Sequence, residues 1–149
     1  MDEIKQQTVI MLQGLPGSGK TFFSNRWCKL SPEYVRVNKD DIRNMILVED
    51  NSKESLVLAC SREIISKALE NGYSVIVDDT NFNPIHEEWL KSEINFHNLG
   101  GRAIVLRTHT MRATLEECIE RDSKRLKPVG EKVIREMNEK WNTKMTVIP

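Results

Sequence analysis

The octapeptide Gly14-Leu15-Pro16-Gly17-Ser18-Gly19-Lys20-Thr21 fits the phosphate-loop pattern G-x-x-x-x-G-K-[ST] at every fixed position. It follows the apolar, β-branched run 8–13 and precedes segment 21–30, where apolar side chains recur at helical spacing. A strand that passes through a glycine-rich turn into a helix points successive backbone N–H groups at phosphate oxygens. The octapeptide therefore predicts a site for the phosphates of a nucleotide.

Individual side chains of this loop have distinct expected roles. Lys20 supplies a positive charge to the β- and γ-phosphates, and the Thr21 hydroxyl can ligate Mg²⁺. We expect further nucleotide contacts from Gly14, Pro16, Gly17, Ser18 and Gly19. ATP with Mg²⁺ is therefore the expected nucleotide. The alternative is a glycine-rich turn without a nucleotide role, and it requires strand, G-K-T and helix to coincide by chance.

Size and composition indicate an ordinary globular chain. Its 149 residues are enough to bury one substantial core and too few for two, so we expect a single domain, 1–149. Lys plus Arg (22) balance Asp plus Glu (22), which removes a whole-molecule electrostatic case for binding nucleic acid or membrane. No apolar run has the length of a membrane span, and residues 1–7 do not resemble a secretory signal. The three widely spaced cysteines suggest neither disulfides nor a metal site, and we expect a cytoplasmic location.

Beyond the loop, apolar strand-length runs alternate with helical segments. We expect strands at 34–38, 73–77 and 103–106, and helices from 39, over 51–71, 84–99, 110–124 and 131–141. Thr110 is the expected cap of the fourth of these helices, and 145–149 is either an edge strand or loose. Strands apolar on both faces predict an α/β fold, with a parallel sheet of about four strands and helices on both faces. Ligands of such folds bind at the carboxyl ends of the strands.

Acidic pairs follow two of these strands. Asp78 and Asp79 end an apolar run as in a Walker B strand, so we expect Asp78 beside the Mg²⁺ that Thr21 holds. Asp40, followed by Asp41, offers a carboxylate that accepts the proton of a hydroxyl during phosphoryl transfer. The alternatives are structural: the first pair caps a turn, and the second complements a helix dipole.

A basic segment lies near the carboxyl end of the sequence. Arg121 and Arg125 are four residues apart and share one face of a continuing helix. In a small kinase, a mobile lid of about residues 121–130 could bring these guanidinium groups over the transferring phosphoryl group. The alternative is a solvated basic helix end.

Four motifs together, G-L-P-G-S-G-K-T, V-N-K-D-D-I-R, V-D-D-T-N-F-N-P and R-D-S-K-R, resemble the kinase domain of the polynucleotide 5′-kinases. The resemblance covers about residues 10–129. It implies a P-loop NTPase fold of the kinase type with a helical lid. It also implies transfer of the ATP γ-phosphate to a 5′-hydroxyl end of DNA or RNA, with Mg²⁺.

The resemblance also assigns roles to residues at matching motif positions. Asp40 would be the general base on the 5′-hydroxyl, and Arg43 would grip a phosphate of the acceptor. Arg125, assisted by Arg121, would be the lid residue on the β- and γ-phosphates. The D-T-N motif, Asp79, Thr80 and Asn81, would belong to the acceptor site.

Two departures from the family pattern limit the expectation. Lys39 replaces the arginine that members commonly carry between Asn and Asp, which keeps a cation there. No D-x-D-G-T motif is present, so we expect no 3′-phosphatase activity, with a separate ligase or phosphatase as partner. Two alternatives stay open: a P-loop kinase of a small hydroxylated metabolite or nucleoside, and a nucleotide-binding regulatory module.

Overall fold

A computed structural model describes residues 3 and 5–142, and the expected segment 145–149 lies outside them. The sheet contains β1 (Gln7–Gln13), β2 (Tyr34–Val37), β3 (Ser74–Val77) and β4 (Ile104–Thr110), in the order β2-β3-β1-β4. Every pairing is parallel; Val9 lies opposite both Val75 and Leu106. The predicted α/β fold with a parallel sheet is confirmed, and this strand order places β3 directly beside the strand that leads into the phosphate loop.

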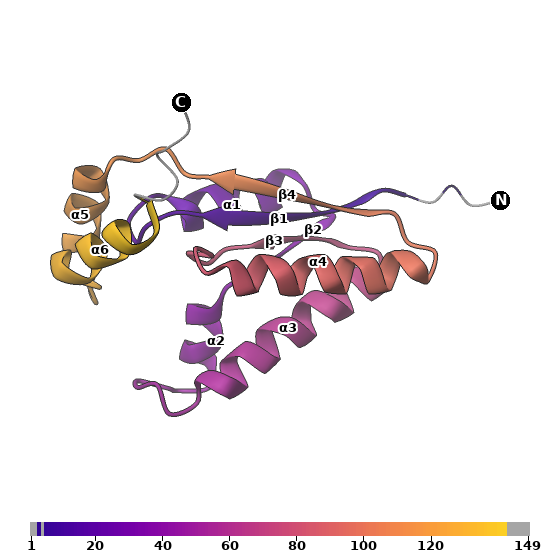
Figure 1. Ribbon diagram of the computed structural model, residues 1–149, viewed down its shortest axis with the longest axis horizontal. Coiled ribbons are helices and arrows are strands. Elements are labelled where there is room, and N and C mark those ends of the chain that lie inside the picture. The colour runs from indigo at the N-terminus through magenta and orange to yellow at the C-terminus, as the bar shows by residue number, and fades with distance from the viewer. Residues whose placement is uncertain (1–2, 4, 143–149) are drawn as a thin grey trace.

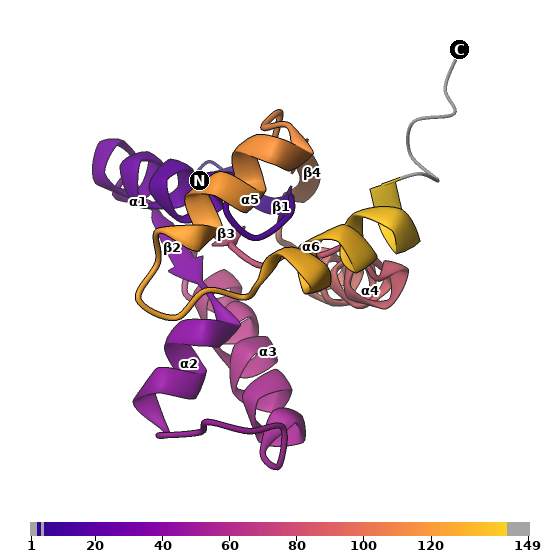
Figure 2. The same cartoon turned by 90° about the vertical axis from the view of Figure 1, so that its left-hand side faces the viewer.

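Helices cover both faces of the sheet (Figures 1 and 2). They are α1 (Lys20–Leu30), α2 (Lys39–Met45), α3 (Glu54–Glu70), α4 (Pro84–Leu99), α5 (Leu115–Ser123) and α6 (Glu131–Met137), the last followed by a π-helical turn (Asn138–Asn142). Helix α1 lies on one face, and α3 and α4 lie on the other. No helix in the described part of the chain is long and apolar enough to cross a membrane.

Alternate side chains of β1 enter two different cores. Val9 and Met11 point toward α3 and α4, where they pack with Leu69 and Leu90. The side chains between them, Ile10 and Leu12, point toward α1. This alternation is the period of two that a strand buried on both faces requires. The central strands are therefore held rigidly from both sides, and so are the segments at their carboxyl ends.

Strand β4 differs from its prediction. It lies at the edge of the sheet and extends to Thr110, and its last four residues are exposed, so it is not apolar on both faces. Thr110 therefore does not cap the next helix. Thr114 does so through a capping box, in which its hydroxyl accepts from the Glu117 N–H and the Glu117 carboxylate accepts from the Thr114 N–H. The sequence contains the T-x-x-E pattern of this capping box at 114–117. The predicted helix start was too early because the apolar run ends at Leu106, whereas the strand continues to Thr110.

The strands point their carboxyl ends toward α5 and α6 (Figure 1). A third apolar cluster, Leu15, Phe82, Cys118 and Ile134, ties these two helices to the loop after β1. The phosphate loop is thus enclosed between the sheet and the carboxyl-terminal helices.

Candidate active site

The phosphate loop curls through glycines in left-handed backbone conformations. Gly17 has φ +82° and Gly19 has φ +95°, values that L-residues with a side chain rarely adopt. A Cβ on Gly17 would also lie 2.3 Å from the Cys118 carbonyl oxygen of α5. Glycine is therefore required at position 17 both by the turn and by the close approach of α5.

Lys20 lies folded back over this loop. Its ammonium donates to the Gly14 carbonyl at 2.7 Å and the Leu15 carbonyl at 2.9 Å. Burial lowers the pKa of Lys20 to about 8, although Asp78 nearby opposes the shift. An anionic phosphate in the loop would satisfy this partly desolvated cation better than two neutral carbonyls do.

Asp78 is the most deeply buried of the acidic residues at the sheet edge, with 1% of its surface exposed. One carboxylate oxygen, Oδ2, accepts from Ser24 Oγ at 2.9 Å and from Arg36 Nε at 2.8 Å. The other, Oδ1, is the one buried side-chain polar atom in the described residues without a hydrogen-bond partner. Such an orphaned acceptor fits a water molecule on a bound Mg²⁺.

The residues present fit a Mg²⁺ ion held largely by phosphates and water. The described residues contain no group of three or more His, Cys, Asp or Glu that could hold a metal. Thr21 and Asp78 instead line the same cavity beside the phosphate loop. Mg²⁺ commonly keeps several waters and binds through one or two protein groups plus substrate phosphates. Thr21 and Asp78 would therefore hold the ion only together with a nucleotide.

Asp40 and Arg43 form a pair on α2. Arg43 Nη1 donates to Asp40 Oδ1 at 2.5 Å. The rest of the guanidinium forms a two-pronged contact with Glu54 of α3, with Nε to Oε1 at 2.7 Å and Nη2 to Oε2 at 2.8 Å. The Glu54 contact raises the Arg43 pKa above its ordinary value. Asp40 itself stays open to the cavity, with 78% of its side chain exposed.

The three residues after Asp78 have different environments. Asp79 accepts the Lys39 backbone N–H at 3.0 Å, and burial raises the pKa of Asp79 to about 6. Thr80 lines the cavity. Asn81 is buried in a left-handed conformation, φ +52°, and its amide donates to backbone carbonyls that include Leu12 at 2.7 Å. Asn81 therefore joins the ends of β1 and β3, a contact that positions the site.

The predicted lid begins at the end of α5. Arg121 Nη1 lies 3.5 Å from the Gly17 carbonyl oxygen. Asp122, 1% exposed, accepts the backbone N–H groups of Val129 at 3.0 Å and Gly130 at 2.9 Å. Arg125 Nη1 lies 3.7 Å from the same carboxylate. The loop that carries Arg125 is thus closed around one buried acidic side chain.

One cavity of about 1080 Å³, including space open to solvent, joins these groups. It is lined by Pro16, Gly17, Gly19, Lys20, Thr21, Phe22, Asn38, Lys39, Asp40, Arg43, Asp78, Asp79, Thr80, Arg121, Arg125 and Val129. Of the residues that the sequence nominated, Gly14, Ser18 and Asn81 do not line it. The structure therefore brings the phosphate loop, three of the four paired aspartates (Asp40, Asp78 and Asp79) and the lid arginines together.

Sequence reasoning missed several residues of this site. Arg36 pairs with both Asp78 and Asp41, and Glu54 and Asp122 hold Arg43 and the lid loop. Arg36 and Asp78 are 42 positions apart and Arg43 and Glu54 are 11 positions apart, so no local pattern predicts these two pairs. For Asp122 the available signal was its place within R-D-S-K-R, beside a turn at Lys127-Pro128.

The parallel sheet with a phosphate loop, a carboxylate after the neighbouring strand and arginines above the loop define a P-loop kinase domain. A family model described as an AAA domain matches residues 9–143, and the chain belongs to that family.

The chain resembles a curated protein by sequence. It is 31% identical over 139 residues to the L-seryl-tRNA(Sec) kinase of Methanococcus maripaludis, an alignment that covers 91% of this chain and 52% of that protein. The chain thus spans about half the length of this relative.

Solved structures with the same fold are more distant in sequence. A chain of the Pnkp1/Rnl/Hen1 RNA repair complex superposes with a TM-score of 0.74 at 20% identity, covering 96% of this chain and 46% of that one. A putative kinase from Chloroflexus aurantiacus superposes with a TM-score of 0.68 at 14% identity, covering 86% and 74%. At these identities the likeness establishes the fold.

Proposed function

We propose that this domain transfers the γ-phosphate of ATP, with Mg²⁺, to the 5′-hydroxyl end of RNA or DNA. The observation that carries the proposal is the single cavity in which Asp40 and Arg43 of α2 line one part, while Lys20 and Arg125 line another. A nucleotide held by the phosphate loop and an acceptor held at α2 would meet inside it.

Each charged group has a task in the proposed reaction. Asp40 accepts the proton of the 5′-hydroxyl as its oxygen bonds to the γ-phosphorus and the bond to the β-phosphate oxygen breaks. Lys20, Arg121 and Arg125 stabilise the negative charge on the phosphoryl and leaving oxygens. The products are ADP and a 5′-phosphorylated end, and the proton that leaves the hydroxyl is taken up by Asp40.

A polynucleotide acceptor explains the cations that lie away from the phosphate loop. Lys39 and Arg43 line the α2 part of the cavity, where the triphosphate does not need them. Arg43 is half-buried and held by Glu54, so its guanidinium is already oriented before an acceptor binds. Cations on protein side chains hold nucleic acid through its phosphates, without reading sequence.

The sequence relative supports a second candidate acceptor. The Methanococcus protein is, by its name, a kinase of L-seryl-tRNA(Sec), and its 31% identity over 91% of this chain favours a hydroxyl carried on an aminoacylated RNA. The same base, phosphate loop and lid would serve that reaction, since only the alcohol differs.

A single transfer assay separates these acceptors. The protein is incubated with γ-labelled ATP, Mg²⁺ and one of three substrates: a 5′-hydroxyl oligonucleotide, its 5′-phosphorylated twin, or seryl-tRNA. We expect label in the first alone. Label in seryl-tRNA alone would favour the second candidate, and label in none would overturn both.

A further inference from the structure

The carboxylate of Asp78 is held by one of its two oxygens. Its Oδ2 accepts from Ser24 Oγ of α1 at 2.9 Å and from Arg36 Nε of β2 at 2.8 Å, and Arg36 Nη2 also lies 2.8 Å from it. The guanidinium continues to α2, where its Nη1 pairs with Asp41. Side chains from α1, β2 and α2 therefore converge on a single carboxylate oxygen, directly or through Arg36.

The other oxygen of Asp78, Oδ1, has no hydrogen-bond partner among the described residues, although the side chain is almost completely buried. A buried charged acceptor without a donor is unfavourable, and water on a bound cation would satisfy it. Three donor atoms on Oδ2 and none on Oδ1 also fix the rotation of the carboxylate, because exchanging the two oxygens would break every one of these contacts. The network therefore reserves Oδ1 for a group that is not part of the protein.

Ser24 connects this carboxylate to the second residue that we expect near Mg²⁺. It lies on α1, three residues after Thr21, and is completely buried. Its hydroxyl accepts from Arg36 Nε at 3.1 Å and donates toward Asp78, with the Thr21 carbonyl oxygen 3.2 Å away as a further acceptor. One hydroxyl and the first turn of α1 thus set the position of Asp78 relative to Thr21.

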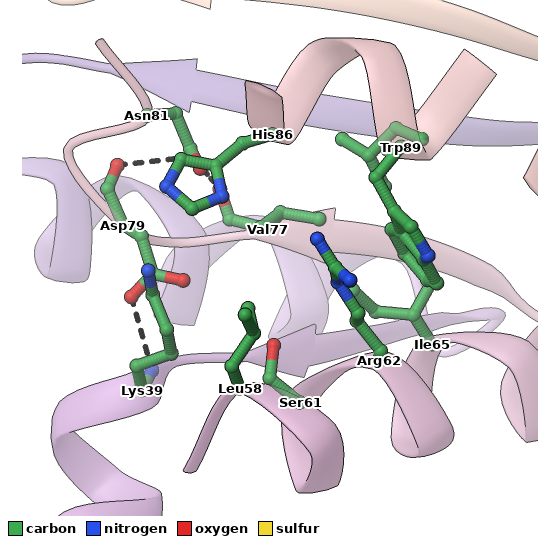
Figure 3. A pocket seen from close by; sticks show the side chains of 11 residues that line it. Lys39, Leu58, Ser61, Arg62, Ile65, Val77, Asp79, Asn81, His86 and Trp89 are labelled. Carbon is green, nitrogen blue, oxygen red and sulfur yellow. Dashed lines mark hydrogen bonds between the residues drawn. The ribbon is translucent and has the colours of Figure 1, made fainter. Parts of the chain in front are cut away.

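Asp79, the next residue, faces the opposite side of the sheet. It lies among side chains of α3 and α4, and its carboxylate accepts the Lys39 backbone N–H at 3.0 Å (Figure 3). The alternation of β3 explains this difference, because Ile76 packs in the core beside α1 and Val77 in the core beside α3 and α4. Of the two aspartates, Asp78 is therefore the one that faces α1.

We propose that Ser24 and Arg36 are positioning residues for the Mg²⁺ that accompanies ATP: they hold Oδ2 of Asp78 so that Oδ1 is presented to the water shell of the ion. The assignment rests on the nucleotide half of the proposed function and not on the identity of the acceptor. Groups that hold a metal-binding side chain commonly change metal affinity by about 10- to 100-fold when they are removed. A network that only neutralised a buried charge would affect stability alone.

The test measures how much Mg²⁺ strengthens the binding of a non-hydrolysable ATP analogue. Titration calorimetry gives Kd with Mg²⁺ and with EDTA, and the ratio of the two is the gain due to the ion. In Ser24→Ala we expect this gain to be about tenfold smaller than in the native protein, with Kd in EDTA changed by less than about twofold. Arg36→Lys keeps the charge but not the forked contact, and it should lose a similar part of the gain.

Ser74→Ala is the matched control. Ser74 is also a buried serine, and it lies at the opposite end of β3, where its hydroxyl accepts the Thr8 backbone N–H at 2.9 Å. The same substitution there should lower the midpoint of thermal unfolding and leave the gain from Mg²⁺ unchanged. A loss of gain in this control equal to that in Ser24→Ala would contradict the positioning role.

A double variant shows whether Ser24 acts through Asp78. Asp78→Asn should remove most of the gain, and adding Ser24→Ala should lower it no further, because the two side chains belong to one network. Losses that multiply would mean that Ser24 acts by another route and would overturn the inference.

The outcomes also separate this inference from the function on which it rests. A full gain in folded Ser24→Ala, or no gain in the native protein, would overturn the positioning role. The expected pattern of gains without transfer to any acceptor would contradict the proposed reaction and leave the positioning role in place. No binding of the analogue by the native protein would overturn both.

Discussion

Asp40 and Asp41 are adjacent on α2 but have different partners. Asp40 pairs with Arg43 and lines the phosphate cavity, whereas Asp41 pairs with Arg36, which in turn holds buried Asp78. The first aspartate is therefore open to the cavity in which we propose that the acceptor binds. The second belongs to a charge network that stabilises the end of β3.

This contrast gives a matched pair of variants. Asp40→Asn should lower kcat for transfer to a 5′-hydroxyl oligonucleotide by roughly a hundredfold or more, because a general base is lost. Asp41→Asn should lower it by less than about tenfold, because the Asp41 carboxylate pairs with Arg36 and does not line the cavity. Steady-state kinetics with labelled ATP measure both, and similar losses in the two variants would contradict the role of Asp40.

Lys20 should take up a proton when the nucleotide binds. Its pKa of about 8 in the free protein must rise when phosphate anions surround it. Above pH 8 a growing fraction of free Lys20 is neutral, so ATP affinity should fall as pH rises, and binding at pH 8.5 should consume protons. Titration calorimetry in two buffers of different ionisation enthalpy measures this uptake; release of protons would be inconsistent with it.

Asp79 should make the fold less stable as pH rises through the acid range. Its folded pKa, about 6, lies above the unfolded value of 3.8, so the folded state holds the extra proton between them. The free energy of unfolding should therefore decline from about pH 4 to pH 6 by an amount that Asp79→Asn removes. Urea unfolding at intervals across this range tests it, and an unchanged slope in the variant would refute the assignment.

At the scale of elements, the junction between α5 and the phosphate loop organises the site. The α5 backbone approaches Gly17 so closely that no side chain fits there, and Arg121 reaches back to the same glycine carbonyl. The lid loop then returns over Asp122 to the start of α6. The lid arginines are therefore positioned by one packed helix and one buried carboxylate.

Asp122→Asn tests this positioning role. Loss of the carboxylate weakens two backbone hydrogen bonds and removes the partner of Arg125, so the lid loop no longer holds Arg125 in place. We expect kcat to fall by about tenfold and the midpoint of thermal unfolding to fall only slightly. Glu120→Gln, whose exposed carboxylate pairs with Lys124 on the same helix, is the control and should leave both unchanged. A large drop in stability with normal kcat would show that Asp122 is structural alone.

The elements themselves were largely predictable. Hydrophobic period and turn residues gave β1 to within a residue and α4 at both ends, because Asn83-Pro84 and Gly100-Gly101 mark those boundaries in the local sequence. The end of β4 and its place at the sheet edge could not be predicted in this way, because an edge strand lacks the apolar pattern along its exposed side. Pairs such as Arg43 with Glu54 depend on how α2 and α3 pack, which no single segment encodes.

At the scale of the whole molecule, function depends on the parallel sheet delivering three strand ends to one edge. The phosphate loop follows β1, Asp40 follows β2 and Asp78 follows β3, and the carboxyl-terminal helices close over them (Figure 1). Residues that are far apart in the sequence, such as Lys20, Asp40 and Asp78, thereby line one cavity. In sheets of this kind ligands bind at the carboxyl ends of the strands, where the strand order changes direction.

The measurement that tests this arrangement most directly is a crystal structure with Mg²⁺, a non-hydrolysable ATP analogue and a short 5′-hydroxyl oligonucleotide. We predict the terminal phosphate between Lys20 and Arg125, and the acceptor's 5′ oxygen within about 3 Å of the Asp40 carboxylate. A 5′ oxygen that lies outside the cavity, or that faces the phosphate with Asp40 turned away from it, would contradict the assignment.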